Sequence, residues 1–229
     1  MTDCCTPRGY SRVFSERSAR AAAKRYRKRG LDATSRRIVD LLTKRGVDGA
    51  TVLEVGGGVG AVQIELLKAG AARAVNVELT PTYEAAADDL LRELGLNERV
   101  ERRVADFADA SAAVDRADIV VLNRVICCYP DMPKLAGAAA EHARQTLVMS
   151  FPRQAPWTRV GLAVANFVLW ITRSEFHVFL HRPRAILATS EGFGLRTVSD
   201  RAGLLWQVAA LERAPGPGIS RDSLADRGS

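Results

Sequence analysis

A run of glycines between a predicted strand and a predicted helix constrains the fold of this chain more than any other feature. The segment TVLEVGGGVGAVQIELL starts as a β-branched strand, Thr51–Val55, passes through Gly56, Gly57, Gly58 and Gly60, and continues as an apolar helical stretch. Glycines let the backbone turn tightly and approach a ligand closely. Open α/β sheets bind ligands at the carboxyl ends of their strands. The loop therefore predicts an α/β fold with a ligand site at the end of its first strand.

The rest of the chain after residue 50 repeats this alternation of strands and helices. Short apolar runs separated by helical stretches predict a mostly parallel sheet with helices on both faces. Only a Ser199–Gly203 turn separates the last two runs, which predicts an antiparallel hairpin at the sheet edge. The seven predicted strands are Thr51–Val55, Ala74–Leu79, Val100–Val104, Ala117–Leu122, Thr146–Phe151, Leu195–Val198 and Leu205–Leu211. The predicted helices between the first five lie at about Val62–Ala69, Thr82–Leu94, Ser111–Val114 and Met132–Ala143.

The positive charge of the chain is concentrated in an N-terminal arm. Residues 1–45 carry 13 Lys and Arg against 4 Asp and Glu, whereas the remaining residues carry 20 against 22. Two helices are predicted in the arm, Ser15–Arg29 and Ala33–Arg45, and Gly30 ends the first of them. The sequence predicts three parts: a basic helical arm or lid (1–46), a ligand-binding domain (47–213) and a disordered Pro/Gly-rich tail (214–229).

Length, composition and cysteine usage exclude several classes of protein. With 229 residues, 47% of them hydrophobic, the chain can form one globular domain with a sizeable core. Its four cysteines form two vicinal pairs, Cys4-Cys5 and Cys127-Cys128, and adjacent cysteines rarely bridge each other. The chain shows no signal-peptide pattern, and its longest apolar run, Val160–Ile171, is shorter than a membrane span. We expect a reduced, cytoplasmic protein without a transmembrane segment.

A carboxylate beside the glycine loop decides between two kinds of cofactor. Gly56, Gly58 and Ala61 also fit a dinucleotide-binding fingerprint, in which the loop approaches a pyrophosphate. Glu54, however, lies two residues before Gly56, which predicts a carboxylate at the mouth of the loop. A carboxylate there would repel a pyrophosphate and attract the ammonium and sulfonium groups of S-adenosylmethionine. The sequence therefore favours S-adenosylmethionine.

The loop resembles motif I of the class I S-adenosylmethionine-dependent methyltransferases, E/D-x-G-x-G-x-G, which residues 54–60 match throughout. The resemblance implies a Rossmann-like fold with a mostly parallel seven-stranded sheet, and methyl transfer as the activity. It also implies that Glu78 accepts hydrogen bonds from the ribose hydroxyls and that Asp106 holds the adenine amine beside Phe107. The implied cofactor-binding residues are Glu54, Gly56, Gly58, Gly60, Glu78, Leu79, Asp106, Phe107 and Asn123.

Beyond the cofactor half, most of the chain is similar to the magnesium-protoporphyrin O-methyltransferases. The similarity covers a helical arm with an aromatic start, a fourth-strand segment that leads to Tyr129-Pro130, and a fifth strand TLVMSFPR followed by an aromatic helix. That family has a His just before the Tyr-Pro pair, where this chain has Cys128. The difference removes a group that titrates near neutral pH. The expectation is therefore a related methyltransferase, not necessarily one for porphyrins.

Three classes of methyl acceptor stay open. A small-molecule carboxylate needs no deprotonation at neutral pH, and Arg124, Arg153 or the basic arm would hold its charge. Thiols from both cysteine pairs would suit a metalloid such as arsenite. RNA would suit the basic arm, but the fourth strand lacks the Asn/Asp-Pro-Pro-aromatic motif of amino-methylating nucleic-acid enzymes, so we expect a small molecule. The candidate residues are Tyr129 and Cys128 for catalysis, and Tyr10, Arg124, Arg153 and His177 for substrate binding.

Two further segments have several interpretations. Trp157–Ile171 predicts an apolar helix that builds an acceptor pocket, packs in the core or forms the seam of a homodimer. His177 and His181 can share one face of their segment, but no third ligand is evident near them, so we predict no metal site.

Overall fold

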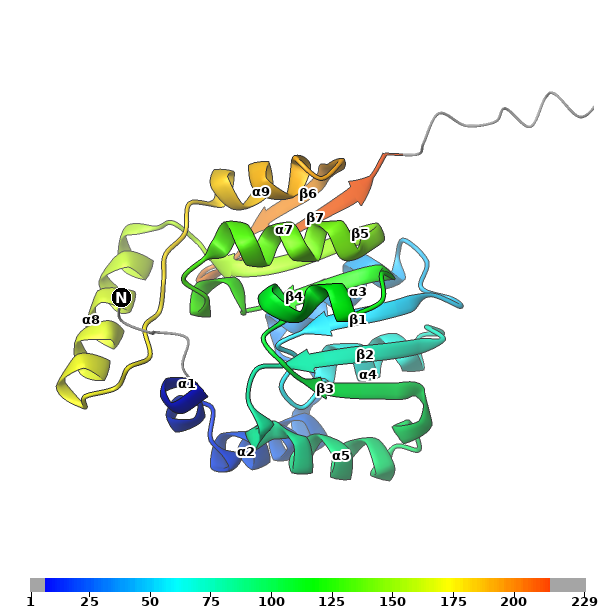
Figure 1. The fold of residues 1–229 in the computed structure, drawn as a ribbon, viewed down its shortest axis with the longest axis horizontal. Helices are drawn as coiled ribbons and strands as arrows, with labels where there is room; N and C mark the ends of the chain where they lie inside the picture. Colours follow the sequence, from blue (N-terminus) through cyan, green and yellow to red (C-terminus); the bar gives the residue numbers. More distant parts are fainter. Residues whose placement is uncertain (1–6, 215–229) are drawn as a thin grey trace, which may run out of the picture.

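A computed structural model describes residues 7–214, in which seven strands form one sheet with the order β3-β2-β1-β4-β5-β7-β6 (Figure 1). Neighbours among the first five strands are parallel, while β7 runs antiparallel to both β5 and β6. This topology confirms the predicted Rossmann-like fold with an antiparallel edge hairpin. The strands are β1 (Thr51–Val55), β2 (Arg73–Glu78), β3 (Val100–Val104), β4 (Ala117–Asn123), β5 (Ala143–Pro152), β6 (Leu195–Ala202) and β7 (Trp206–Arg213).

Helices cover both faces of the sheet because alternate residues of each strand point to opposite sides. Val52 packs in one hydrophobic core with α2, α3, α4 and α5, whereas Leu53 packs in a second core with α6, α7 and α9. The helices are α1 (Pro7–Val13), α2 (Glu16–Arg29), α3 (Ala33–Thr43), α4 (Ala61–Lys68), α5 (Glu84–Glu93), α6 (Phe107–Ala110), α7 (Met132–His142), α8 (Pro156–Ile171) and α9 (Pro183–Glu191). Four 3₁₀ turns complete the elements, namely η1 (Pro81–Tyr83), η2 (Asn97–Arg99), η3 (Ser111–Ala113) and η4 (Ile126–Cys128).

The N-terminal arm folds back onto the domain. Ser15 caps α2, since its side chain accepts a hydrogen bond from the Ser18 backbone N–H. Ala19, Ala23 and Tyr26 of α2 are buried in the same core as α4 and α5. The arm is thereby fixed against the helices that cover this face of the sheet. Residues 1–6 and 215–229, which include Cys4, Cys5 and nearly all of the predicted tail, lie outside the described residues.

Several boundaries differ from the predictions. The Ser199–Gly203 turn is wrong, because Ser199, Asp200 and Arg201 continue β6 and pair with β7, which leaves the turn to residues 203–205. The sequence missed α1 and α9, which are short and each begin with a proline. The expected helix at Ser111–Val114 is only a 3₁₀ turn that follows the short α6.

The predicted apolar helix after the fifth strand exists as α8, but core packing is the wrong interpretation of it. Thr158 is its only buried residue, and Trp157, Val160 and Trp170 are at least half exposed. No helix among the described residues is long and apolar enough to cross a membrane.

Candidate active site

A cavity of about 300 Å³ lies at the carboxyl ends of the parallel strands. Its floor comes from the glycine loop after β1 and from the ends of β2, β3 and β4, while α1 and α2 of the arm supply the opposite wall. The predicted site residues that line it are Tyr10, Gly56, Gly58, Glu78, Leu79, Asp106, Phe107, Asn123, Arg124, Cys128 and Tyr129. The fold thus brings together side chains from five segments that are far apart in the sequence.

The glycine loop has a conformation that only glycine adopts without strain. Gly56 and Gly58 have φ of 63° and 58°, in the left-handed region, and both line the cavity. A Cβ atom on Gly57 would fall 2.3 Å from Asn76 Nδ2 and 2.6 Å from Glu54 Cδ, so the loop also lies directly on buried side chains. Gly60 does not line the cavity, since it is the N-cap of α4. The loop is therefore packed closely against buried side chains on one side and borders the cavity on the other.

Glu54 does not lie at the mouth of the loop, which corrects the prediction. The side chain is 1% exposed and outside the cavity lining, beneath the loop. Strand alternation turns it to the same side as Val52, where one carboxylate oxygen accepts a hydrogen bond of 3.2 Å from the Gln63 backbone N–H in the first turn of α4. Burial raises the pKa of Glu54 to about 8, although the Gln63 N–H and the Arg102 charge lower it. Glu54 thus supports the loop from behind.

We expect Glu54 to make the stability of the protein fall as pH rises. Its pKa of about 8 in the folded protein exceeds the ordinary 4.5, so the folded protein retains a proton that the unfolded chain has lost. The free energy of unfolding should therefore decrease between pH 4.5 and 8, by at most about 1.4 kcal/mol per pH unit. Urea denaturation of wild type and Glu54→Gln across this range measures the effect. The wild type should lose stability relative to Glu54→Gln, and an equal slope for both proteins would contradict the assignment.

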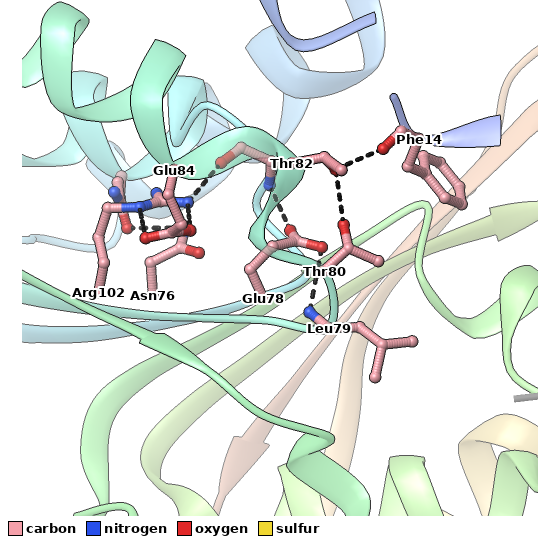
Figure 2. A network of polar contacts seen from close by, with 10 residues as sticks. Phe14, Asn76, Glu78, Leu79, Thr80, Thr82, Glu84 and Arg102 are labelled. Carbon is pink, nitrogen blue, oxygen red and sulfur yellow. Dashed lines mark hydrogen bonds and ion pairs between the residues drawn. The ribbon is translucent and has the colours of Figure 1, made fainter. Parts of the chain in front are cut away.

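Glu78, unlike Glu54, lines the cavity. Figure 2 shows its hydrogen bonds to the surrounding backbone. One oxygen accepts a hydrogen bond of 2.9 Å from the Gly58 backbone N–H and the other accepts one of 3.1 Å from the Leu79 N–H. Burial raises the pKa of Glu78, while these N–H groups and Arg102 lower it. Each carboxylate oxygen has a second lone pair for a further donor. Glu78 therefore holds the loop and still offers acceptors to a ligand in the cavity.

Arg102 holds the other side of the same loop (Figure 2). Its guanidinium donates to the Gly58 carbonyl over 3.0 Å and forms a bidentate ion pair with Glu84, with distances of 2.7 and 3.0 Å. Thr82, in the η1 turn just before α5, connects this region to the arm, because its hydroxyl donates a hydrogen bond to the Phe14 carbonyl (Figure 2). These contacts join the loop, β3, α5 and the arm into one connected structure.

A second acidic residue lines the cavity at the end of β3. Asp106 caps α6 by accepting a hydrogen bond of 3.0 Å from the Ala108 backbone N–H. The Tyr129 hydroxyl donates to the same carboxylate, 3.0 Å from its nearer oxygen. Phe107 is buried beside them with its ring edge against His142. Asp106, Phe107 and Tyr129, predicted separately from two strand ends, thus meet in one part of the cavity.

The end of β4 carries two polar residues with fixed partners. Asn123 accepts a hydrogen bond of 2.7 Å from the Ser150 hydroxyl and donates one of 3.0 Å to Ser35 of α3. Arg124, with a left-handed φ of 64°, lies 2.5 Å from an Asp32 oxygen and stacks over the Trp206 ring. The charge of Arg124 is therefore neutralised within the protein.

Cys127 and Cys128 form a thiol pair on the η4 turn. Their sulfur atoms lie 3.8 Å apart, and each is 3.6 Å from the Arg124 carbonyl oxygen. The hydrogen bond between the thiols lowers the pKa of Cys127 and raises that of Cys128. Only Cys128 lines the cavity. The Tyr10 hydroxyl of α1 donates to the Cys128 carbonyl, which places the arm directly against this turn.

Arg153 and His177 do not take part in the cavity. Arg153 lies over the Trp157 ring and its guanidinium is 3.4 Å from the Gly203 carbonyl oxygen. His177 is exposed in the segment after α8. The prediction for His177 assumed that α8 would border the site, but α8 lies outside the cavity lining.

Sequence reasoning missed several residues of the cavity lining, among them Arg25 and Tyr83. Arg25 of α2 lines the cavity, and only the density of positive charge in the arm could have indicated it. Tyr83 also lines the cavity, and its ring lies 3.2 Å from where a Cβ of Gly58 would be. Tyr83 lies five residues after Glu78, at the end of the 3₁₀ turn η1. Within residues 7–214, no group of three or more His, Cys, Asp or Glu could hold a metal ion.

Comparisons with known proteins agree with this architecture. Residues 16–200 match the model of a family described as a methyltransferase domain. A ribosomal protein L11 methyltransferase from Pectobacterium carotovorum is 34% identical over 95 residues, and this match spans 40% of the present chain but only 32% of that protein.

Two solved structures share the fold. Magnesium protoporphyrin IX methyltransferase from Synechocystis PCC 6803, solved with bound S-adenosylhomocysteine, has a TM-score of 0.64 and 18% identity, covering 79% of this chain and 82% of that one. An O-methyltransferase family protein from Burkholderia thailandensis has a TM-score of 0.65 and 23% identity, covering 89% and 64%. At these identities the likeness concerns the fold.

Proposed function

Because the chain belongs to the methyltransferase domain family and is thus an S-adenosylmethionine-dependent methyltransferase, we propose that it methylates a small, anionic acceptor in the cavity beneath its N-terminal arm. The family match covers residues 16–200, which include the five parallel strands, the glycine loop and every strand end that lines the cavity. The nature of the acceptor and the roles of individual residues are the proposal.

The cavity residues fit the cofactor. Glu78 offers carboxylate lone pairs to the ribose hydroxyls, and Asp106 beside Phe107 offers an acceptor and an apolar surface to the adenine. Gly56 and Gly58 present bare backbone, which leaves room for the methionine part of the cofactor. Bound S-adenosylmethionine supplies an electrophilic methyl group on a sulfonium. The chain itself binds and orients the two reactants, which can provide most of the rate in such a displacement.

The observation that carries the small-molecule proposal is the enclosure of the cavity by the arm. Tyr10, Phe14 and Arg25 form part of its wall, and its volume of about 300 Å³ is at the lower end for small-molecule sites. The arm is held there by the bonds from Tyr10 to the Cys128 carbonyl and from Thr82 to the Phe14 carbonyl. A folded RNA or protein acceptor could enter only after these contacts break.

The charges around the cavity favour an anionic acceptor. Arg124 is paired with Asp32, whereas no carboxylate of residues 7–214 forms an ion pair with Arg25. We assign Arg25 to binding the negative charge of the acceptor, in place of the arginines predicted from the sequence. A carboxylate acceptor needs no general base at neutral pH. Tyr129 and Cys128 then contact and orient it, with Tyr129 fixed by Asp106.

Transfer of a radiolabelled methyl group tests the acceptor class. We expect label from S-adenosylmethionine to enter the low-molecular-weight filtrate of a cell extract and not its protein or RNA fraction. Arg25→Ala should lower the initial rate about 10-fold or more at limiting filtrate, since a charge-assisted hydrogen bond contributes about 1.5–3 kcal/mol. Arg29→Ala, an exposed arginine of the same helix outside the cavity lining, is the matched control and should keep the rate. Label in the protein or RNA fraction would contradict the proposal.

A metalloid acceptor is the second candidate because two thiols lie together at the cavity. The sulfur atoms of Cys127 and Cys128 are 3.8 Å apart, and thiolates are the preferred ligands of soft ions. If arsenite is the acceptor, the wild type should methylate it and the double variant Cys127→Ser/Cys128→Ser should not. No turnover of arsenite by the wild type, or equal turnover by both proteins, would remove this candidate.

A further inference from the structure

Helix α8 exposes an apolar surface that the domain does not use. It lies at the margin of the molecule, away from the sheet (Figure 1). Trp157, Val160, Val164, Phe167, Val168 and Ile171 follow one another at helical spacing along one face, and each is at least half exposed. Trp170, 70% exposed, extends this face near the end of the helix. An apolar stripe of this kind is stabilised when other apolar groups cover it and remove it from water.

The apolar surface continues onto the turn between β6 and β7. Leu204 and Leu205 are 75% and 51% exposed, and the Trp157 indole N–H donates a hydrogen bond of 3.1 Å to the Leu204 carbonyl. Nine of the twelve exposed large apolar residues in the described chain belong to α8 and this turn, which we call the α8 patch. Exposed apolar patches of this extent mark interaction sites.

The charges around the α8 patch determine what can cover it. Between residues 152 and 190 the chain has five arginines, Arg153, Arg159, Arg173, Arg182 and Arg184, and Glu175 is the only acidic residue. A second copy of the chain would place these positive charges against one another, because a two-fold dimer brings the same surface together twice. An anionic lipid surface instead complements them, while its acyl region accepts the aromatic and aliphatic side chains.

Hydrogen bonds hold α8 in a fixed position on the segment that follows it, residues 172–182. Asn166, on the inner side of the helix, donates a hydrogen bond of 2.9 Å to the Val178 carbonyl and accepts one of 2.9 Å from the Val178 N–H. The next residue of this segment, Phe179, donates a backbone hydrogen bond of 2.7 Å to the Cys127 carbonyl. Upstream in it, the Phe176 ring packs against Tyr10 and Phe14 of the cavity wall. The patch is thus connected to the wall of the cavity.

We propose that the α8 patch is an interfacial anchor that binds the surface of an anionic lipid bilayer. The apolar stripe of α8 enters the boundary between headgroups and acyl chains, parallel to the membrane plane. Arg159 and Arg173, both exposed, remain at the level of the headgroups. The anchor places the cavity wall next to the lipid surface, whatever the methyl acceptor is.

Sedimentation with lipid vesicles tests the proposal. The full chain should bind vesicles of phosphatidylcholine containing phosphatidylserine, and bind vesicles of phosphatidylcholine alone at least about 10-fold more weakly at low salt. Val164→Asp, in the patch, should reduce binding to the anionic vesicles about 10-fold or more. Val198→Asp is the matched control, since this valine of β6 is 45% exposed against 57% for Val164 and the charge change is the same. Thermal unfolding of both variants verifies that they fold.

Tryptophan quenching by brominated lipids locates the contact. A variant that keeps only Trp170 should be quenched on anionic vesicles more strongly than a variant that keeps only Trp206, which begins β7 behind the patch residue Leu205. No binding of the wild type to anionic vesicles, or equal loss of binding in Val164→Asp and Val198→Asp, would overturn the proposal. A dimer in sedimentation velocity that Val164→Asp dissociates, without vesicle binding by the wild type, would show that a second copy covers the patch instead.

Discussion

Glu78→Ala is expected to weaken the binding of S-adenosylhomocysteine by about 100-fold or more. The change removes a carboxylate that we assign to both ribose hydroxyls, and each hydrogen bond to a charged acceptor contributes about 1.5–3 kcal/mol. It also releases the Gly58 and Leu79 N–H groups that the carboxylate holds. Isothermal titration calorimetry of wild type and variant measures the difference.

Two further variants show whether the effect belongs to the ribose contact. Glu78→Gln keeps the size of the side chain and one acceptor oxygen, so it should bind more tightly than Glu78→Ala and more weakly than the wild type. Glu101→Ala removes an exposed carboxylate from the neighbouring strand β3 and should leave binding unchanged. Equal affinity of Glu78→Ala and wild type would refute the assignment of Glu78.

Gly57→Ala should have the second large effect, on both folding and binding. The added methyl group would lie 2.3 Å from Asn76 Nδ2 and 2.6 Å from Glu54 Cδ, both in buried side chains that cannot move away freely. Overpacking of this kind costs about 1–3 kcal/mol and shifts the backbone. We expect a lower melting temperature and a loss of S-adenosylhomocysteine binding, because the loop must rise into the cavity.

Gly161→Ala is the matched control for this substitution. Gly161 lies in α8, and a Cβ there would meet no other atom within 4 Å. Alanine in a helix is favoured over glycine by about 0.5–1 kcal/mol, so the melting temperature should stay equal or rise. Gly57→Ala that melts and binds like the wild type would contradict the close packing beneath the loop.

The sequence predicted the sheet well because its signals are local. The strands of the parallel part are short and, apart from the charged β3, rich in apolar and β-branched residues, and each appears within one or two residues of its predicted start, apart from the longer β5. The glycine loop and the acidic residues at the ends of β2 and β3 also follow from strand ends, which the topology gathers at one edge. For Glu78, Asp106 and Phe107 the sequence thus indicated a place on the cavity wall, and their roles toward the cofactor stay predictions.

Side-chain direction was harder to predict than position. The spacing places Glu54 beside the loop, but the alternation of β1 turns its carboxylate under the loop toward α4. Arg124 lies at the end of β4, as predicted. Its guanidinium, however, forms an ion pair with Asp32, which is 92 residues earlier in the sequence. Such pairings depend on segments that meet only in the folded protein.

The surroundings of α8 show the limit of reasoning from neighbours in the sequence. Arg153 and His177 flank this helix, and both were predicted to bind the substrate, with an acceptor pocket as one of three interpretations of the helix. The helix instead leans away from the sheet and exposes its apolar face. Hydrophobicity alone does not say whether the partner of a helix is its own core, another chain or a lipid surface.

A crystal structure of the protein with S-adenosylhomocysteine tests the central claim most directly. The ligand should occupy the cavity at the carboxyl ends of β1 to β4, with its ribose hydroxyls on the Glu78 carboxylate and its adenine beside Asp106 and Phe107. Its sulfur should face Tyr10, Cys128 and Tyr129, where the acceptor would meet the methyl group. Binding elsewhere on the protein, or with the ribose away from Glu78, would contradict the account of this site.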